Sequence, residues 1–453
     1  MTSPKHFALA PLAAGLLSFA LVPQAGAQPT TAPRISAQPA TAGPAGGAVN
    51  CNAPFGWWES PNLNPIFPAN KPPPGPTDCD FQIWSWTAFV HWMQNDPRTG
   101  KPAFLNLPTP DDLASGDPAR MRAAPRALVL KPRNQKPKSL SEIQQAGSGG
   151  VLVDQSGRAV YYATHMDPVY FATAQQYYGA ANYAKAPPAT PFPVNATVFK
   201  TAWRIVQPNA IPTDAYSTQA TIALLESDGQ GGLRTSGQTQ NATVALVGVH
   251  VVGVVQDHPE FLWATFEQTN NAPDLPPNVQ PGSSDPVSSR SFTFYRANTP
   301  ANASNQMPTS YTIDPATQAI SPVTNAFRQF AWGGATPDRV QDITSSNKNF
   351  QDHIRGGSAK SIDQVFANYV MHGTVWILAN TLQPGDGNLD TQAIGSPSLA
   401  SSVMETFVQG AGTNCFSCHN TSGGSGYPGK DINLSHVILG SLAPNPELLR
   451  ARR

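Results

Sequence analysis

The sequence has few charged residues, and their charges cancel. Only 12% of the 453 residues are charged, against about 25% in an average soluble domain. There are 28 Lys and Arg residues and 28 Asp and Glu residues, so the formal net charge is zero. Proteins that bind nucleic acid by neutralising phosphates need an excess of positive charge. The balance therefore excludes a strongly basic nucleic-acid-binding protein.

Long apolar runs are missing after the N-terminus. The longest, over 244–255, has twelve residues, short of the roughly 18 that a membrane helix needs. At the N-terminus, Lys5 and His6 precede an apolar stretch over 7–22, and Ala25-Gly26-Ala27 is typical of a signal-peptidase site. We therefore expect a signal peptide over 1–27 and a mature protein without a membrane span, periplasmic or secreted.

The composition does not favour a helical bundle, because the chain has 46 prolines, roughly twice the average share of about 5%. β-rich segments separated by Pro, Gly, Asn and Ser predict antiparallel strands at 194–206, 219–226, 242–255, 260–267 and 291–296, with a hairpin across 151–162. Helices are predicted at 81–94, 323–332 and 361–371. The expected fold class is α+β, with a mainly antiparallel, β-rich domain and a helical C-terminal segment.

Four cysteines are present, and the last two lie in Cys415-Phe416-Ser417-Cys418-His419. In an exported protein, C-x-x-C-H is the signature of covalent c-type haem attachment, in which both sulfurs reach the porphyrin vinyl groups and the histidine binds the iron. A zinc site would need further Cys or His ligands nearby, and a thioredoxin-type pair would need a βαβ context. A disulfide or a chance match is the remaining alternative.

On this motif the sequence resembles large single-haem c-type cytochromes whose attachment site lies near the C-terminus. The stretches 263–267 and 379–381 are also similar to segments of uncharacterised bacterial proteins of that kind. The resemblance implies one covalent haem c, thioethers at Cys415 and Cys418, and His419 as the proximal iron ligand. Cys51 and Cys79 are then left to form a disulfide, with two free thiols as the alternative.

The expected organisation follows from these features. A leader rich in Ala, Pro, Thr and Gly over 28–50 should be disordered. A β-rich domain should span 51–390, and a cytochrome c-like haem-binding segment 391–453. In that segment Leu399, Val403 and Phe407 recur at helical spacing, which predicts a helix from about Ser396 to Gly410. So short a segment should need the β-rich domain to complete its haem pocket.

The sixth iron position stays open at this stage. The candidates are His436, Met404, Met371, His372 and His250, or an open or water-bound site. Two strong ligands favour electron transfer with exported redox proteins, whereas an open position permits peroxidase-like or small-molecule oxidation. A third alternative is a haem with a structural or sensing role. Seven basic residues without an acid over 120–138 could steer an anionic partner, or could simply form a solvated loop.

Overall fold

A computed structural model describes residues 51–52, 77–115, 128–130, 143, 146–147, 149–177, 182, 185, 192–357, 361–377, 392–398, 400–410 and 413–419. The expected signal peptide, the leader, most of the basic segment and His436 lie outside these residues. The chain from Ala48 to Arg453 forms one compact unit. No helix in the described part is both long and apolar enough to cross a lipid bilayer.

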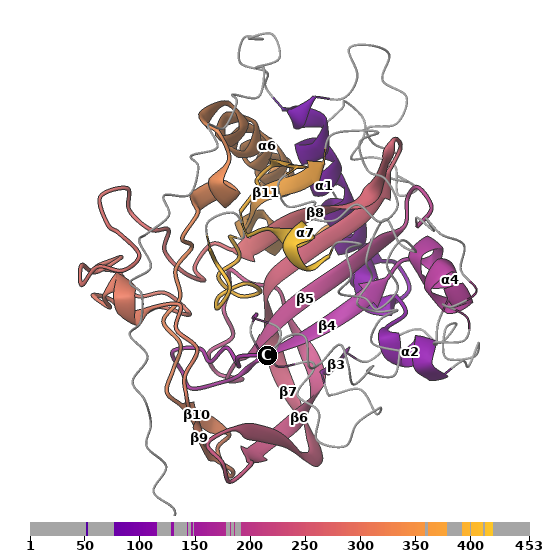
Figure 1. The fold of residues 1–453 in the computed structure, drawn as a ribbon. Coiled ribbons are helices and arrows are strands. Elements are labelled where there is room, and N and C mark those ends of the chain that lie inside the picture. Colours follow the sequence, from indigo (N-terminus) through magenta and orange to yellow (C-terminus); the bar gives the residue numbers. More distant parts are fainter. Residues whose placement is uncertain are drawn as a thin grey trace, which may run out of the picture. The chain divides into compact units, whose positions relative to one another are not determined.

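The architecture is α+β and β-rich, as predicted, and its centre is an eight-stranded sheet (Figure 1). Its order is β12-β11-β8-β7-β5-β4; β6 pairs with β7, and β3 pairs with β6. All pairs are antiparallel except β3 with β6. The strands are β3 (Leu128–Leu130), β4 (Val160–Met166), β5 (Thr197–Ile205), β6 (Ser217–Ser227), β7 (Leu233–Val255), β8 (His258–Gln268), β11 (Tyr369–Ile377) and β12 (Ala393–Gly395).

Helices and two small hairpins surround this sheet. The hairpins pair β1 (Asn95–Asp96) with β2 (Lys101–Pro102) and β9 (Thr312–Asp314) with β10 (Ala319–Ser321). The α-helices are α1 (Asp78–Met93), α2 (Pro110–Ser115), α4 (Pro168–Tyr177), α6 (Pro337–Arg355) and α7 (Cys415–Cys418). The 3-10 helices are η2 (Ala103–Asn106), η3 (Ala301–Ala303), η4 (Ala331–Gly334) and η5 (Gln364–Asn368).

Helix α1 is the buried helix that the sequence predicts. Thr77 and Asp80 form a capping box at its start, and both of its inward tryptophans are fully buried. Trp86 packs edge-on against Phe266 of β8 and donates its indole N–H to Asn347 of α6. Because α1 is apolar nearly all round, it is covered on one side by the sheet and on another by α6.

Strand β8 shows how the sheet separates two faces. Leu262, Ala264 and Phe266 belong to the core that contains α1. The alternate residues Trp263, Thr265 and Glu267 lie on the opposite face, as expected from the two-residue period of a strand. Helix α7 lies against this second face, beside β8 (Figure 1).

Several predicted elements are wrong, and in each case non-local contacts override the local signal. Segment 291–296 forms turns with one isolated bridge. Segment 323–332 is extended apart from the start of η4, since its amides donate to distant carbonyls, as Thr324 does to Val153 and Ala326 to Phe294. Segment 361–371 contains η5 and the start of β11, because β11 completes its hydrogen bonds with β8. Helix α6 was not among the predicted elements.

The structure contains the predicted disulfide between Cys51 and Cys79. It ties the start of α1 to a residue 28 positions earlier in the chain, and both cysteines are buried. A bridge of this span removes loop-closure entropy from the unfolded state.

Replacing both Cys51 and Cys79 with Ala should therefore lower the free energy of unfolding by about 2–4 kcal/mol. Denaturant titration of the oxidised proteins measures this difference. Reductant should shift the wild-type midpoint in the same direction and leave the variant unchanged. Equal midpoints for both oxidised proteins would contradict the prediction.

Candidate functional site

The C-x-x-C-H motif forms a single helical turn, α7. Asn414 caps it: its side chain accepts a hydrogen bond from the Phe416 amide, while the Ser417 hydroxyl accepts one from the Asn414 amide. Cys415 and Cys418 are the first and last residues of this turn. Their spacing of three residues brings both to one side of a helix. The backbone of the turn thus places the two cysteine positions on one side of α7.

Two aromatic contacts hold α7 on the sheet. Phe416 is buried in a small apolar cluster with Val375 and Ile377 of β11. The ring of His419 lies 4.2 Å from that of Trp263 on β8, centre to centre. The position of the histidine after the turn is thus set by the sheet as well as by its own sequence.

A small pocket of about 20 Å³, with room for about one water molecule, opens beside Cys415. Strands β8 and β11 contribute one part of the lining, and Gly333, Ser396, Ser398, Ala400 and Glu405 contribute another. Its lining comprises Trp263, Thr265, Gly333, His372, Gly373, Val375, Ser396, Ser398, Ala400, Glu405, Asn414 and Cys415. The pocket joins the C-terminal motif to the β-rich part of the chain.

Two polar atoms in this lining have no hydrogen-bond partner in the protein. They are the indole nitrogen of Trp263 and the hydroxyl of Ser396, and both are buried. Buried polar groups without partners are costly and point to a missing ligand or water. Cys415, His372 and these two donors are chemically suited to a haem, but the pocket as it stands is far too small to accommodate a porphyrin ring.

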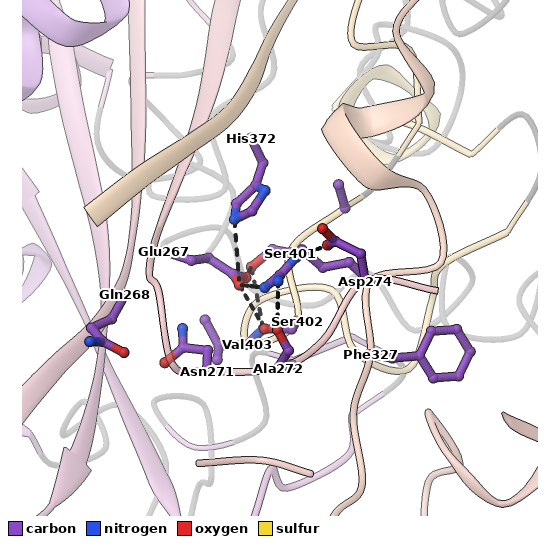
Figure 2. A network of polar contacts seen from close by, with 12 residues as sticks. Glu267, Gln268, Asn271, Ala272, Asp274, Phe327, His372, Ser401, Ser402 and Val403 are labelled. Carbon is purple, nitrogen blue, oxygen red and sulfur yellow. Dashed lines mark hydrogen bonds and ion pairs between the residues drawn. The ribbon is translucent and has the colours of Figure 1, made fainter. Parts of the chain in front are cut away.

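Glu267 is the centre of a buried polar network (Figure 2). Its carboxylate accepts hydrogen bonds from the hydroxyls of Ser401 and Ser402, both at 2.7 Å, and from the Arg328 guanidinium at 2.9 Å. Arg328 also donates to the Asp274 carboxylate and the Ala272 carbonyl. Because each group here is paired, the network is rigid and can hold a buried charge.

His372 belongs to both the network and the pocket. Its Nε2 atom lies 4.0 Å from a carboxylate oxygen of Glu267 (Figure 2). Burial lowers its pKa well below the usual value, with the Arg328 charge acting in the same direction. The imidazole is therefore neutral at physiological pH, the form in which histidine binds metals.

A second buried carboxylate, Glu405, reaches the pocket itself. Its side chain accepts hydrogen bonds from the amides of Ala400 and Ser401, and its other oxygen lies 3.4 Å from Nε2 of His250. Burial raises the pKa of Glu405 to about 7. Burial, together with the charge of Lys200, lowers the pKa of His250 to about 3. Below neutral pH the pair is thus uncharged, and a protonated Glu405 can donate to the neutral imidazole.

Glu405 should make the protein less stable as the pH rises. Its folded-state pKa of about 7 exceeds its usual value of 4.5, so the folded state binds the extra proton between these values. Its contribution to stability is complete below pH 4.5 and is lost as the pH rises through 7. Glu405→Gln mimics the protonated acid and removes this titration.

Between pH 5 and pH 8, the wild type should therefore lose about 2–3 kcal/mol more unfolding free energy than Glu405→Gln does. Denaturant titrations of both proteins at the two pH values give the comparison. All other titratable groups are the same in the two proteins. Parallel pH dependences of the unfolding free energy would therefore show that Glu405 is ionised at both pH values.

The predicted helix from Ser396 to Gly410 is wrong, since residues 402–408 form turns. The Glu405 carboxylate accepts hydrogen bonds from the backbone amides of Ala400 and Ser401. The hydroxyls of Ser401 and Ser402 donate hydrogen bonds to Glu267. Side-chain bonds of this kind compete with helical hydrogen bonding. The apolar residues still point to the protein interior, as Val403 is buried against Gly248 of β7.

The structure does not bring all of the site residues that were predicted from the sequence to one place. Cys415 is half-buried and lines the pocket with His372, while His419 contacts Trp263. Cys418 ends α7, but its side chain lies outside the description, as does all of His436. Met371, Met404 and His250 are buried and do not line the pocket. Within the described part of the chain, no three His, Cys, Asp or Glu side chains cluster as a metal site.

Sequence reasoning missed Glu267, Arg328, Glu405 and Lys200. One signal was available: Glu267 directly follows the mainly apolar run 261–266 of β8, and a buried strand rarely keeps a carboxylate without a partner. The partner, Arg328, lies 61 residues away in a segment without regular structure, so no spacing rule connects them.

Comparison with known proteins does not assign this chain to a family. No protein-family model, no curated protein and no solved structure matches this chain.

Proposed function

We propose that this protein is an exported c-type cytochrome that transfers single electrons between redox proteins. It would carry one haem c attached through Cys415 and Cys418, with His419 as the proximal iron ligand. The observation that carries this proposal is the position of the C-x-x-C-H turn: Cys415 lines a pocket shared with the central sheet. When bound, a haem supplies an iron that accepts and releases one electron.

The chain's own residues would fix the haem environment. Trp263 packs on the ring of His419 and limits its rotation. Trp263 and Ser396 bring unpaired polar atoms to the pocket beside Cys415. The network of Glu267, Ser401, Ser402 and Arg328 lies next to His372, which lines the pocket. Burial and hydrogen bonding near a haem are the levers that set its reduction potential.

The test is the mature protein, produced by export with haem-maturation machinery. Its mass should equal residues 28–453 plus one haem, and its denatured band should stain for haem. The reduced protein should give the spectrum of a low-spin c-type haem that is unchanged by carbon monoxide. A mature protein without bound haem would refute the proposal.

A haem enzyme is the second candidate, and one observation favours it. Glu405 lines the pocket with a pKa raised to about 7 by burial, which suits a group that gives and takes protons at neutral pH. This candidate needs an open iron position, so it predicts a high-spin spectrum and ready binding of carbon monoxide or cyanide.

A further inference from the structure

We propose that the pocket beside Cys415 binds one water molecule, and that this water carries protons between solvent and the buried carboxyl group of Glu405. The inference goes beyond the proposed function and does not depend on a bound haem. It rests on the size of the pocket, on two unpaired polar atoms in its lining and on the carboxyl group beside them.

The size of the pocket admits a water molecule and little else. Its volume of about 20 Å³ exceeds the roughly 10–15 Å³ that a single water needs. A water stays in such a cavity when two to four polar groups can hydrogen-bond it, whereas an apolar cavity stays dry. The polar groups of the lining therefore decide whether the pocket binds water.

Three polar side chains of the lining can hold this water. The indole N–H of Trp263 and the hydroxyl of Ser396 are buried, and neither has a hydrogen-bond partner in the described part of the chain. An indole N–H only donates, whereas a hydroxyl donates and accepts. Glu405 lines the same pocket and supplies an acceptor. A water that accepts from Trp263 and Ser396 and donates to Glu405 satisfies both unpaired atoms.

Gly373 makes room for the Ser396 hydroxyl. It follows a β-bulge at His372, and its φ of +141° is a conformation that residues with a side chain rarely adopt. An added Cβ at Gly373 would collide with the Ser396 side chain. The Ser396 amide donates to the Thr374 carbonyl, which fixes the serine against β11. The chain thus has a hydroxyl in the pocket lining where a side chain on β11 would displace it.

The Glu405 carboxyl group has one oxygen left for a water. Its Oε2 atom accepts hydrogen bonds from the amides of both Ala400 and Ser401. Its Oε1 atom lies 3.4 Å from Nε2 of His250, an atom without a hydrogen-bond partner among the described residues. Oε1 therefore has a lone pair that can accept from the water.

The titratable groups around Glu405 are His250 on β7, Lys200 opposite it on β5, Glu267 on β8, His372 on β11 and Cys415 in α7. Burial raises the pKa of Glu405 to about 7, with Glu267 acting in the same direction and Lys200 against it. His250 stays neutral, because burial lowers its pKa to about 3. Glu405 therefore changes its charge near neutral pH and needs a path for its proton.

The lining of the pocket provides such a path, because it runs from half-buried to buried residues. Four residues are half-buried, namely Trp263, Thr265, Ser398 and Cys415, and the buried ones include Ser396 and Glu405. A water between these two sets gives one proton to Glu405 and takes one from a solvent molecule, so it remains a water. Without it, Glu405 would exchange its proton only when the fold opens locally.

Crystallography and infrared spectroscopy of the mature full-length protein test the two parts of the proposal. A crystal structure that resolves ordered water should show one molecule within hydrogen-bonding distance of Trp263 Nε1 and Ser396 Oγ. In infrared difference spectra between pH 5 and pH 8, the carboxylic C=O band that is missing in Glu405→Gln belongs to Glu405. The shift of this band after rapid mixing with heavy water measures the rate of proton exchange.

The double variant Trp263→Phe, Ser396→Ala removes two of the three partners of the water. Exchange of the Glu405 proton should then slow at least about tenfold, because it depends on local opening. Trp332→Phe is the matched control and should exchange at the wild-type rate, since Trp332 packs on the ring of His372 but does not line the pocket. Should the double variant fail to fold, each single variant replaces it, and exchange should slow in both.

A pocket that is dry, or filled by a side chain, in the crystal structure would overturn the water site. Equal exchange rates in the wild type and the variants would overturn the proton path. Neither measurement involves haem. A mature protein without haem would therefore refute the proposed function and leave this inference in place.

Discussion

Replacing Cys415 and Cys418 together with Ala should remove all covalent haem from the exported protein. In the proposed function each thiol would supply one of the two thioether bonds, and both cysteines lie in the single turn of α7. Without them, a haem could be held only by iron ligation and pocket contacts, and denaturation would release it. Haem staining of a denaturing gel should therefore fall to background. His419→Ala, which keeps both thiols, should instead impair maturation or leave the iron with altered ligation.

The matched control for this experiment is the Cys51→Ala, Cys79→Ala protein. It loses the same number of thiols, but from the disulfide at the start of α1. Its haem staining per mole of protein should equal that of the wild type, although its stability is lower. Retained staining in the Cys415→Ala, Cys418→Ala protein would show that these cysteines do not attach haem.

Arg328→Met should destabilise the protein by about 3–5 kcal/mol, because it leaves the Glu267 carboxylate buried without its cation. Arg328 is 6% exposed and Glu267 is 0% exposed, so water cannot replace the lost partner. The two serine hydroxyls on Glu267 are neutral donors and compensate only in part. Chemical denaturation of the variant and the wild type measures the difference.

A surface ion pair provides the matched control for this substitution. Arg234 donates to Glu226 at 2.7 Å, a distance similar to that of the buried pair, but both side chains are more than a third exposed. Arg234→Met should cost less than about 1 kcal/mol. Glu267→Gln added to Arg328→Met should recover part of the loss, since it removes the uncompensated charge. Equal effects of Arg328→Met and Arg234→Met would show that the buried pair is not a stability determinant.

Elements with a strong local signal could be predicted from the sequence. Strands β5, β6, β7 and β8 were predicted because β-rich runs between Pro, Gly, Asn and Ser segments need only neighbouring residues to be recognised. Helix α1 was predicted because an acidic cap precedes an uninterrupted apolar stretch. The disulfide followed from pairing the two cysteines outside the C-x-x-C-H motif.

Elements that depend on distant partners could not be predicted. The segment over 369–371 was predicted as the end of a helix, yet it begins β11 because β8 offers it a hydrogen-bonding edge. The turn over 402–408 replaces a predicted helix because Glu267, more than 130 residues earlier, accepts two of its serine hydroxyls. In both cases a tertiary hydrogen bond outweighs a propensity that is worth only tenths of a kcal/mol per residue.

The sequence by itself predicted the chemistry of the candidate site, because Cys415, Cys418 and His419 have the spacing of a c-type haem attachment motif. It also determined the β-rich class, since strand periodicity is local. Only the tertiary structure decided what faces that turn. The bulge at His372, the carboxylate of Glu267 and its partner Arg328 come from three separate segments, which meet because the pairing of β8 with β11 and the packing of 400–410 on the sheet bring them together. Such a meeting depends on burial and pairing across the whole chain, which no local pattern encodes.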